Sequence, residues 1–408
     1  MLANARSSHE EILEPPPLGE DDSHVPVALN PTVFRRHLMS WYRAHARELP
    51  WRSISDPYKT WVSEVMLQQT RVEAVIDHYN DFLQRFPTLL ALSLAAEEEV
   101  LASWSGLGYY RRARMLHKAA QFIARERKGV LPRTAIELRT LPGIGEYTCA
   151  AIASIAFGQS IAVVDGNVER VLLRLTGRAE QANAVGRAFV QQQANLLVPR
   201  KRLEGTTNAA GDHNQAMMEL GATICLPRAP LCLHCPVYGM CTTRGEHATQ
   251  PRAKQRSRPA AYLLSLRKRG IVTEVMLERR AADATLMAGM YELPPLPQDA
   301  VESREPMLRL RHAITNTNYY VQVFTPIGSK DRALRRAVPA ARTDLHWVRT
   351  SRLYALALTG LARKILQRLD VMAVRPVLLP EPKAVPLKKK SRAATKLKST
   401  TRSQGATK

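Results

Sequence analysis

Two acidic residues in apolar surroundings are the side chains best suited to acid–base chemistry. Glu64 lies in the run WVSEVML, where its apolar neighbours favour burial on a helix. Burial raises the pKa of a carboxyl group and makes it a usable proton donor at neutral pH, although an isolated Glu is more often a surface residue or an ion-pair partner. Asp165 lies in VVDGNV and is expected to cap the following helix, a role compatible with chemistry.

Four of the five cysteines form a second candidate site, with the pattern C-x6-C-x2-C-x5-C. Clustered cysteines in an intracellular protein indicate metal ligands rather than disulfides, and four thiolates bind either zinc or a [4Fe–4S] cluster. A zinc ribbon usually has two short C-x2-C pairs, whereas this sequence has one, between longer spacers. The fifth cysteine, Cys149, is expected to be a small core residue. The candidate ligands are Cys225, Cys232, Cys235 and Cys241.

A glycine-rich hairpin at residues 141–147, LPGIGEY, is the candidate for an anion contact. Pro142 cannot continue a helix, and Gly143 and Gly145 favour positive φ and close approach of another backbone. The small, apolar helix expected after the hairpin would present free N–H groups, which bind anions. The net charge of +23 favours a nucleic-acid phosphate, while a turn that only packs two helices is the alternative.

Helical periodicity dominates residues 31–247, and no strand-like alternation precedes about residue 255. A basic, proline-bounded linker is expected at 248–258. Beyond it, AYLLSL and VTEVMLERR are typical of paired strands, NYYVQVF of a third and LHWV of a fourth, and a helix is expected near 356–369. The sequence therefore predicts a multidomain protein, with an all-α domain followed by a smaller α/β domain at 259–373.

The composition bounds the class of protein. A length of 408 residues with 45% hydrophobic content is enough for two or three domain cores. No apolar run approaches membrane-spanning length, and the N-terminal segment has neither a signal-peptide nor a transit-peptide pattern. We therefore expect a cytoplasmic bacterial protein with no membrane partner. The acidic, proline-rich segment 1–30 and the basic tail 374–408 are expected to be disordered.

Several runs together resemble the helix-hairpin-helix base-excision DNA glycosylases and, within that superfamily, the MutY-type adenine DNA glycosylases. In chain order these runs are SEVMLQQT, LPGIGEYTCAAI, VVDGNV and NQAMMELGATIC, followed by the cysteine spacing of that family's iron–sulfur loop. The resemblance implies an all-α glycosylase domain with a [4Fe–4S] cluster in the loop 225–241. It also implies a base excision repair enzyme, expected to be a monomer, that hydrolyses the N-glycosidic bond of adenine mispaired with 8-oxoguanine or guanine in double-stranded DNA.

The resemblance implies a role for each candidate catalytic residue. Glu64 protonates the departing adenine at N7, and Asp165 stabilises the oxocarbenium-like sugar that remains. Tyr147 and Asn167 assist the hydrolysis by water. The endonuclease III branch has a lysine at the position of Tyr147 and cuts the strand through a Schiff base, which a phenol cannot form. The chain is therefore expected to be a monofunctional glycosylase.

The resemblance also implies residues that contact DNA. Trp51 and Arg52 help to line the adenine pocket, and Gln69 enters the base stack near the lesion after the target base has left the duplex. Tyr109 is either the aromatic wedge beside the lesion base or a core tyrosine, because only one of the two adjacent tyrosines need face DNA. Glu219 either contacts adenine or has a structural role.

The smaller domain resembles the Nudix-like domain by which MutY-type enzymes recognise 8-oxoguanine. LMAGMYELPPL corresponds to that family's small-residue and aromatic stretch, whereas the metal-binding run of glutamates of a Nudix pyrophosphatase is missing. Many relatives carry Phe-Ser-His in the loop that reads the lesion, and this chain has Ile314, Thr315 and Asn316. The hydroxyl and the amide keep hydrogen-bonding groups there, and the strength of the preference for 8-oxoguanine stays open.

Two other functions stay open. An endonuclease III-like lyase acting on oxidised pyrimidines would be trapped on DNA by borohydride, but Tyr147 and the second domain argue against it. A catalytically silent lesion-binding protein would bind a mispair without releasing the base, but the presence of both Glu64 and Asp165 argues against it.

Overall fold

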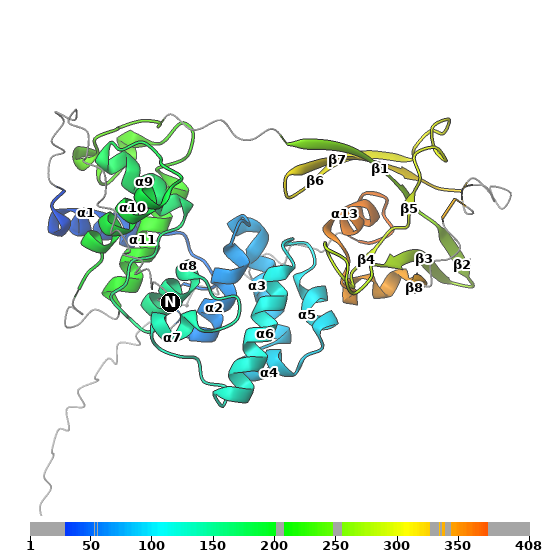
Figure 1. Cartoon of the computed structure of the whole chain (residues 1–408), viewed down its shortest axis with the longest axis horizontal. Helices are drawn as coiled ribbons and strands as arrows, with labels where there is room; N and C mark the ends of the chain where they lie inside the picture. Colours follow the sequence, from blue (N-terminus) through cyan, green and yellow to red (C-terminus); the bar gives the residue numbers. More distant parts are fainter. Residues whose placement is uncertain are drawn as a thin grey trace, which may run out of the picture. The chain divides into compact units, whose positions relative to one another are not determined.

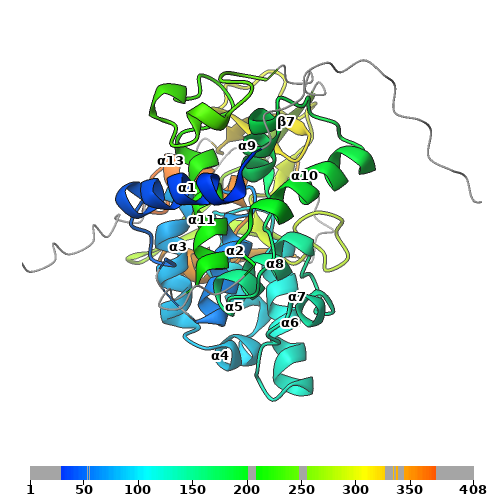
Figure 2. The ribbon, with the colours of Figure 1, turned by 90° about the vertical axis from the view of Figure 1, so that its left-hand side faces the viewer.

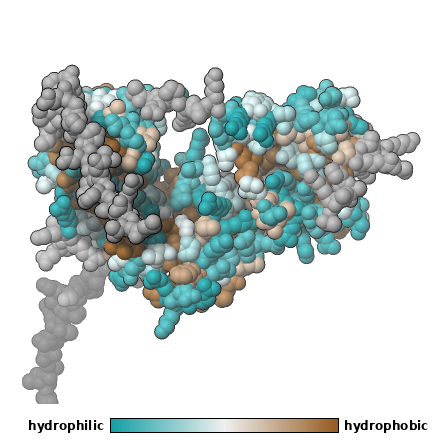
Figure 3. Space-filling view, in the orientation of Figure 1, coloured by the Kyte–Doolittle hydropathy of each residue, from teal (hydrophilic) through white to brown (hydrophobic). Residues whose placement is uncertain are grey.

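The computed structural model describes residues 29–52, 54, 56–200, 208–247, 255–326, 334, 337–338 and 344–373. All of them belong to one compact unit, residues 1–373. The predicted disorder at residues 1–28 and in the basic tail concerns segments that lie outside the described residues, as do residues 248–254 of the predicted linker. Within the described ranges, no helix has the length and apolar character needed to cross a membrane. The face of the molecule in Figure 3 is mostly hydrophilic, with smaller hydrophobic areas.

The described chain up to residue 247 is helical, as predicted (Figure 1). The helices are α1 (Pro31–His45), α2 (Pro57–Leu67), α3 (Val72–Arg85), α4 (Leu89–Leu94), α5 (Glu97–Trp104), α6 (Arg111–Glu126), α7 (Ala135–Arg139), α8 (Glu146–Ile155), α9 (Gly166–Thr176), α10 (Ala184–Leu197) and α11 (Ala209–Thr223), followed by the short 3-10 helices η1 (Cys232–His234) and η2 (Tyr238–Met240). Asn30 and Asp56 start α1 and α2, because each side chain accepts backbone N–H groups and a proline follows at the first helical position.

The helices pack around two hydrophobic cores. Helices α2 to α8 share the first core, which contains Trp61 and Trp104. Helices α1, α9, α10 and α11 share the second, which contains Phe34 and Leu172, and they lie side by side in Figures 1 and 2. The segment between α8 and α9 therefore passes from one core to the other, and Asp165 stands at its end.

The predicted hairpin lies between α7 and α8, and one of its glycines is required by the packing. Gly143 has φ +73°, and a Cβ atom there would come within 2.4 Å of the Cβ of Met115 on α6. Gly145 has φ −87° and is the N-cap of α8, so the predicted positive φ is wrong at this position. The extended backbone at Gly145 is enough to start α8, because the turn itself is made at Gly143.

The described part beyond residue 255 contains two sheets, an α-helix and the 3-10 helix η3 (Thr350–Ala355) (Figure 1). One sheet has the order β5-β1-β7-β6, with β1 and β7 parallel, and the other the order β2-β3-β4, with β8 paired to β3. The helix α13 (Gly360–Arg368) shares a core with strands of both sheets. The strands are β1 (Arg256–Leu263), β2 (Leu266–Arg269), β3 (Val272–Arg279), β4 (Tyr291–Glu292), β5 (Pro295–Leu296), β6 (Leu308–Ile314), β7 (Thr317–Phe324) and β8 (Leu345–Arg349).

Two details differ from the sequence prediction. AYLLSL pairs with VTEVMLERR only at its end, where Leu266 on β2 lies opposite Val275 on β3. Residues 261–263 belong instead to β1, which pairs with β7 and β5. The chain changes sheet between Leu263 and Leu266, within what reads as one apolar run. The strand β1 also begins at Arg256, inside the range predicted as linker, because its register with β7 starts at the pair Arg256 and Thr317.

Candidate active site

A cavity of about 850 Å³ brings together candidate residues from both helical cores. Helix α2 reaches it from the first core, and the end of the α8–α9 segment and helix α11 reach it from the second. The two candidate acids, which are far apart in the sequence, therefore line the same cavity. The candidates that line it are Trp51, Arg52, Glu64, Gln69, Gly143, Gly145, Tyr147, Asp165, Asn167 and Glu219.

Glu64 is the buried acid of this cavity. It lies on α2 and is 5% exposed, so the burial predicted from its neighbours is confirmed. Burial raises the pKa of Glu64 to about 7, and the negative charge of Asp165 adds to that effect, whereas a hydrogen bond from Tyr147 opposes it. The phenol of Tyr147 donates to Glu64 Oε2 at 2.5 Å. The carboxyl group can therefore hold a proton near neutral pH.

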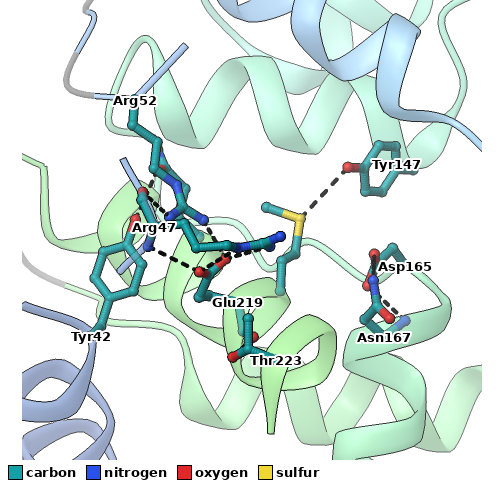
Figure 4. Close-up of polar contacts among 10 residues, drawn as sticks. Tyr42, Arg47, Arg52, Tyr147, Asp165, Asn167, Glu219 and Thr223 are labelled. Carbon is teal, nitrogen blue, oxygen red and sulfur yellow. Dashed lines mark hydrogen bonds and ion pairs between the residues drawn. The ribbon is translucent and has the colours of Figure 1, made fainter. Parts of the chain in front are cut away.

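Tyr147 lies beside Glu64, at the start of α8. Burial raises the pKa of its phenol well above the usual value, and the carboxylates of Glu64 and Asp165 raise it further. The phenol therefore stays protonated and acts as a hydrogen-bond donor. Its oxygen also lies 3.6 Å from the sulfur of Met218 on α11, a contact drawn in Figure 4.

Asp165 caps α9, as predicted. Its Oδ1 accepts the backbone N–H groups of Asn167 at 3.0 Å and Val168 at 2.8 Å, and its Oδ2 accepts the side-chain amide of Asn167 at 3.0 Å (Figure 4). Arg170, one turn further along α9, donates to Asn167 Oδ1 at 2.8 Å and to the carbonyl of Cys225 at 2.8 Å. The carboxylate and the amide are therefore held in fixed orientations.

Glu219 forms the charged side of the cavity. Its side chain is 1% exposed and pairs with Arg47 at 2.8 Å and with Arg52 at 2.6 Å, so that both guanidinium groups converge on it in Figure 4. Burial alone would raise the pKa of Glu219, but the hydrogen bonds and charges of the two arginines lower it to about 2. At neutral pH the site thus holds one carboxyl group near its pKa, Glu64, and one that is ionised, Glu219.

A second cavity, of about 1280 Å³, has Gln69, Tyr109, Gly143 and Thr315 among its lining residues. Tyr109 is 50% exposed while the adjacent Tyr110 is 6% exposed, so Tyr109 is not the core tyrosine of the pair. Gln69 and Gly143 line both cavities, which are therefore adjacent. Thr315 and Asn316 form the two-residue turn between β6 and β7, but Asn316 does not line either cavity.

The four clustered cysteines lie in the loop that follows α11. None of them forms a disulfide, and Cys149 is buried in the first core as predicted. Burial raises the pKa of the Cys235 thiol to about 11, and the other three cysteines of the loop add to the rise. The guanidinium of Arg174 lies 3.4 Å from Cys225 Sγ. In the described ranges, no three His, Cys, Asp or Glu side chains are grouped closely enough to hold a metal ion.

The sequence analysis missed three arginines that organise this region. Arg47 pairs with Glu219 across 172 positions, Arg170 joins α9 to the cysteine loop, and Arg112 binds backbone at the end of α2. No local pattern marks an arginine whose acceptors are backbone carbonyls from distant segments.

Comparison with known proteins gives a family for the central part of the chain. Residues 62–191 match the family described as HhH-GPD superfamily base excision DNA repair protein. The chain is 45% identical over 251 residues to the adenine DNA glycosylase of Rattus norvegicus, covering 58% of this chain and 46% of that protein. It is 48% identical over 225 residues to the adenine DNA glycosylase of Homo sapiens, covering 52% and 40%. The chain thus spans about half the length of the curated relatives it matches.

Among solved structures, a thermostable thymine-DNA glycosylase is similar with 28% identity and a TM-score of 0.47, over 52% of this chain and 96% of that chain.

Proposed function

We propose that this chain is an adenine DNA glycosylase. Residues 62–191 match the HhH-GPD superfamily of base excision DNA repair proteins, and the chain is similar to adenine DNA glycosylases over a longer range. The reaction is hydrolysis of the N-glycosidic bond of adenine mispaired with 8-oxoguanine or guanine, without strand cleavage. The observation that carries the proposal is the protonatable Glu64, hydrogen-bonded to Tyr147 in a cavity that it shares with Asp165.

The side chains divide the reaction between them. Glu64, with a pKa of about 7, donates its proton to N7 of the extruded adenine, so that the base leaves neutral. The carboxylate of Asp165 stabilises the positive charge that develops at C1′. Water then attacks C1′, assisted by the phenol of Tyr147 and the amide of Asn167, and the carboxylate of Glu64 left by the first step accepts the proton that the water loses. Tyr147 offers no amine for a Schiff base, which supports a monofunctional enzyme over the lyase.

The same cavity fits recognition of adenine. Trp51 is 8% exposed and offers an apolar wall, while Glu219, Arg47 and Arg52 offer acceptors and donors to the base edge. The net charge of +23 and the hairpin with Gly143 and Gly145 support binding to the phosphates of double-stranded DNA. A monomer and a bacterial cytoplasmic location remain predictions from the sequence.

We also propose that Cys225, Cys232, Cys235 and Cys241 hold a [4Fe–4S] cluster. The donor set fits in its chemistry, because all four cysteines are free thiols in one short loop and the guanidinium of Arg174 lies near Cys225 Sγ. A bound cluster would cross-link the loop 225–241 and could exchange electrons. Iron and sulfide analysis of purified protein tests this, and stoichiometric zinc without iron would contradict it.

The part beyond residue 255 is proposed to be a Nudix-like domain that recognises 8-oxoguanine. Thr315 lines the same cavity as Gln69 and Tyr109, which supports a contact with the base opposite the adenine. Asn316 is the second candidate of this turn.

A single-turnover assay on duplex DNA with an adenine mispaired with 8-oxoguanine tests the function. Wild-type protein should release adenine, Glu64→Gln should lose that activity, and Glu126→Gln, at an exposed position of α6, should retain it. No release by wild-type protein, or full release by Glu64→Gln, would refute the assignment. Tight mispair binding without release would favour the silent lesion-binding protein instead.

A further inference from the structure

Two loops of the larger cavity carry non-glycine residues with left-handed backbone. Gln69, after α2, has φ +55°, and Tyr109, before α6, has φ +48°. This conformation is unfavourable for residues with a Cβ atom, so it persists only where the surroundings impose it. Both residues line the same cavity, and the side chain of Tyr109 is half exposed there. Contacts from the rest of the fold must therefore hold these two exposed loops in their strained conformations.

Arg112, in the first turn of α6, binds both loops through its guanidinium. On the α2 side it donates to the carbonyl of Gln68, immediately before Gln69, and to Thr70 Oγ1 at 3.0 Å, immediately after it. On the other side it donates to the carbonyl of Gly108, immediately before Tyr109, at 3.3 Å. Its remaining acceptors are the carbonyls of Val65 at 2.9 Å, Met66 at 3.0 Å and Leu107 at 3.4 Å.

The guanidinium is suited to this task in shape and in charge. Its two terminal nitrogens lie in one plane and donate to both sets of acceptors at once, whereas a lysine ammonium has a single nitrogen. The positive charge also lies at the C-terminal end of α2, where free carbonyls favour a cation. The carbon Cζ lies 5.4 Å from the centre of the Tyr109 ring, so Arg112 contacts the side chain of Tyr109 as well as the backbone before it.

We infer that Arg112 is a positioning residue that holds Gln69 and Tyr109 at a fixed separation, so that both enter the duplex as one unit when adenine is extruded. The inference rests on the proposed function and extends it. Arg112 acts on extrusion rather than on bond cleavage, because four of its six acceptors belong to the two loops, the other two are backbone carbonyls near the end of α2, and Glu64 is not among them.

The test separates extrusion from chemistry. Arg112→Met and Arg112→Lys are compared with Arg125→Met, an exposed arginine on the same helix. Excision is measured in single turnovers on a duplex with mispaired adenine and on one in which the adenine is an unpaired bulge, where little unstacking is needed. A 2-aminopurine beside the adenine reports base unstacking. We expect Arg112→Met to excise mispaired adenine about 100-fold more slowly, with most of this loss absent on the bulge.

The substitution Thr70→Val gives an independent probe that removes one acceptor and keeps the arginine. Thr70→Val should slow excision of mispaired adenine less than Arg112→Met does, and most of this loss should again be absent on the bulged adenine. The double variant Arg112→Met with Gln69→Ala should be no slower than Arg112→Met alone, because both changes remove the same step. The inference would be overturned if Arg112→Met and Thr70→Val slowed excision equally on mispaired and on bulged adenine. It would also be overturned if the two rate losses were additive in the double variant. Absence of excision by wild-type protein would instead refute the proposed function.

Discussion

Removing the phenol of Tyr147 should move the pH dependence of the reaction in a defined direction. Burial raises the pKa of Glu64 from 4.5 to about 7, and the hydrogen bond from Tyr147 works against that rise because it stabilises the ionised carboxylate. The substitution Tyr147→Phe keeps the ring and deletes this donor, which lies 2.5 Å from Glu64 Oε2. The pKa of Glu64 should therefore rise further.

The size of the shift follows from the energy of the hydrogen bond. A hydrogen bond to a charged group contributes about 1.5–3 kcal/mol, and 1.36 kcal/mol corresponds to one pKa unit, so we expect an increase of about 1–2 units. Glu64 acts in its protonated form, so excision is fast below its pKa and is lost as the pH rises through it. The alkaline fall of the rate should move from about pH 7 in the wild type to about pH 8–9 in Tyr147→Phe.

The assay is single-turnover excision between about pH 5.5 and 9.5 with saturating protein, which isolates the step after binding. The maximum excision rate of Tyr147→Phe should fall, because the phenol also assists the attack of water. The pH at which the rate falls on the alkaline side does not depend on that maximum rate. Glu64→Gln should show no such limb. An unchanged limb, or one shifted to lower pH, would refute the reasoning.

Four further predictions follow from the same contacts. Tyr147→Lys introduces an amine beside C1′ and should form a borohydride-trapped adduct with DNA, whereas the wild-type protein should form none. Glu219→Gln leaves Arg47 and Arg52 without their carboxylate and should lower the free energy of urea unfolding at pH 7 by about 2 kcal/mol, a value discounted because Arg47 is partly exposed. This stability is present above the unfolded carboxyl pKa of about 4 and is lost as the pH falls towards about 2, so the difference between variant and wild type should shrink below pH 4. Cys235→Ser should reduce bound iron and visible absorbance, and an unchanged iron content would exclude Cys235 as a ligand. Asn316→Ala should weaken the preference for 8-oxoguanine, so that the dissociation constants for the guanine and the 8-oxoguanine mispair become more similar. An unchanged ratio of these constants would show that Asn316 has no part in lesion recognition.

Properties determined by near neighbours in the chain could be predicted from the sequence. The burial of Glu64 follows from the apolar residues beside it on α2, and the capping by Asp165 follows from the glycine and the helix after it. The turn at Gly143 was predicted for the same reason, since proline and glycine restrict the local backbone. The sequence also indicated that one of two adjacent tyrosines is exposed, but not which one.

Properties determined by distant segments could not be predicted in this way. The hydrogen bonds of Arg47 with Glu219 span 172 positions, and the acceptors of Arg112 on α2 and its loop are backbone or hydroxyl oxygens whose positions depend on the packing of α6 against α2. The strand pairing could be predicted only in part for the same reason. The chain passes from β1 to β2 without a turn signal strong enough to separate the two sheets, so one apolar run was assigned to one strand.

The packing of Gly143 against Met115 has a consequence for the proposed contacts with DNA. Met115 and Arg112 are three residues apart on α6, which corresponds to about 4.5 Å along the helix axis. One turn of α6 therefore holds both the hairpin proposed to bind phosphate and the two side chains proposed to enter the duplex. The two proposed contacts are then a fixed distance apart, so a bound phosphate would determine which base step the side chains reach.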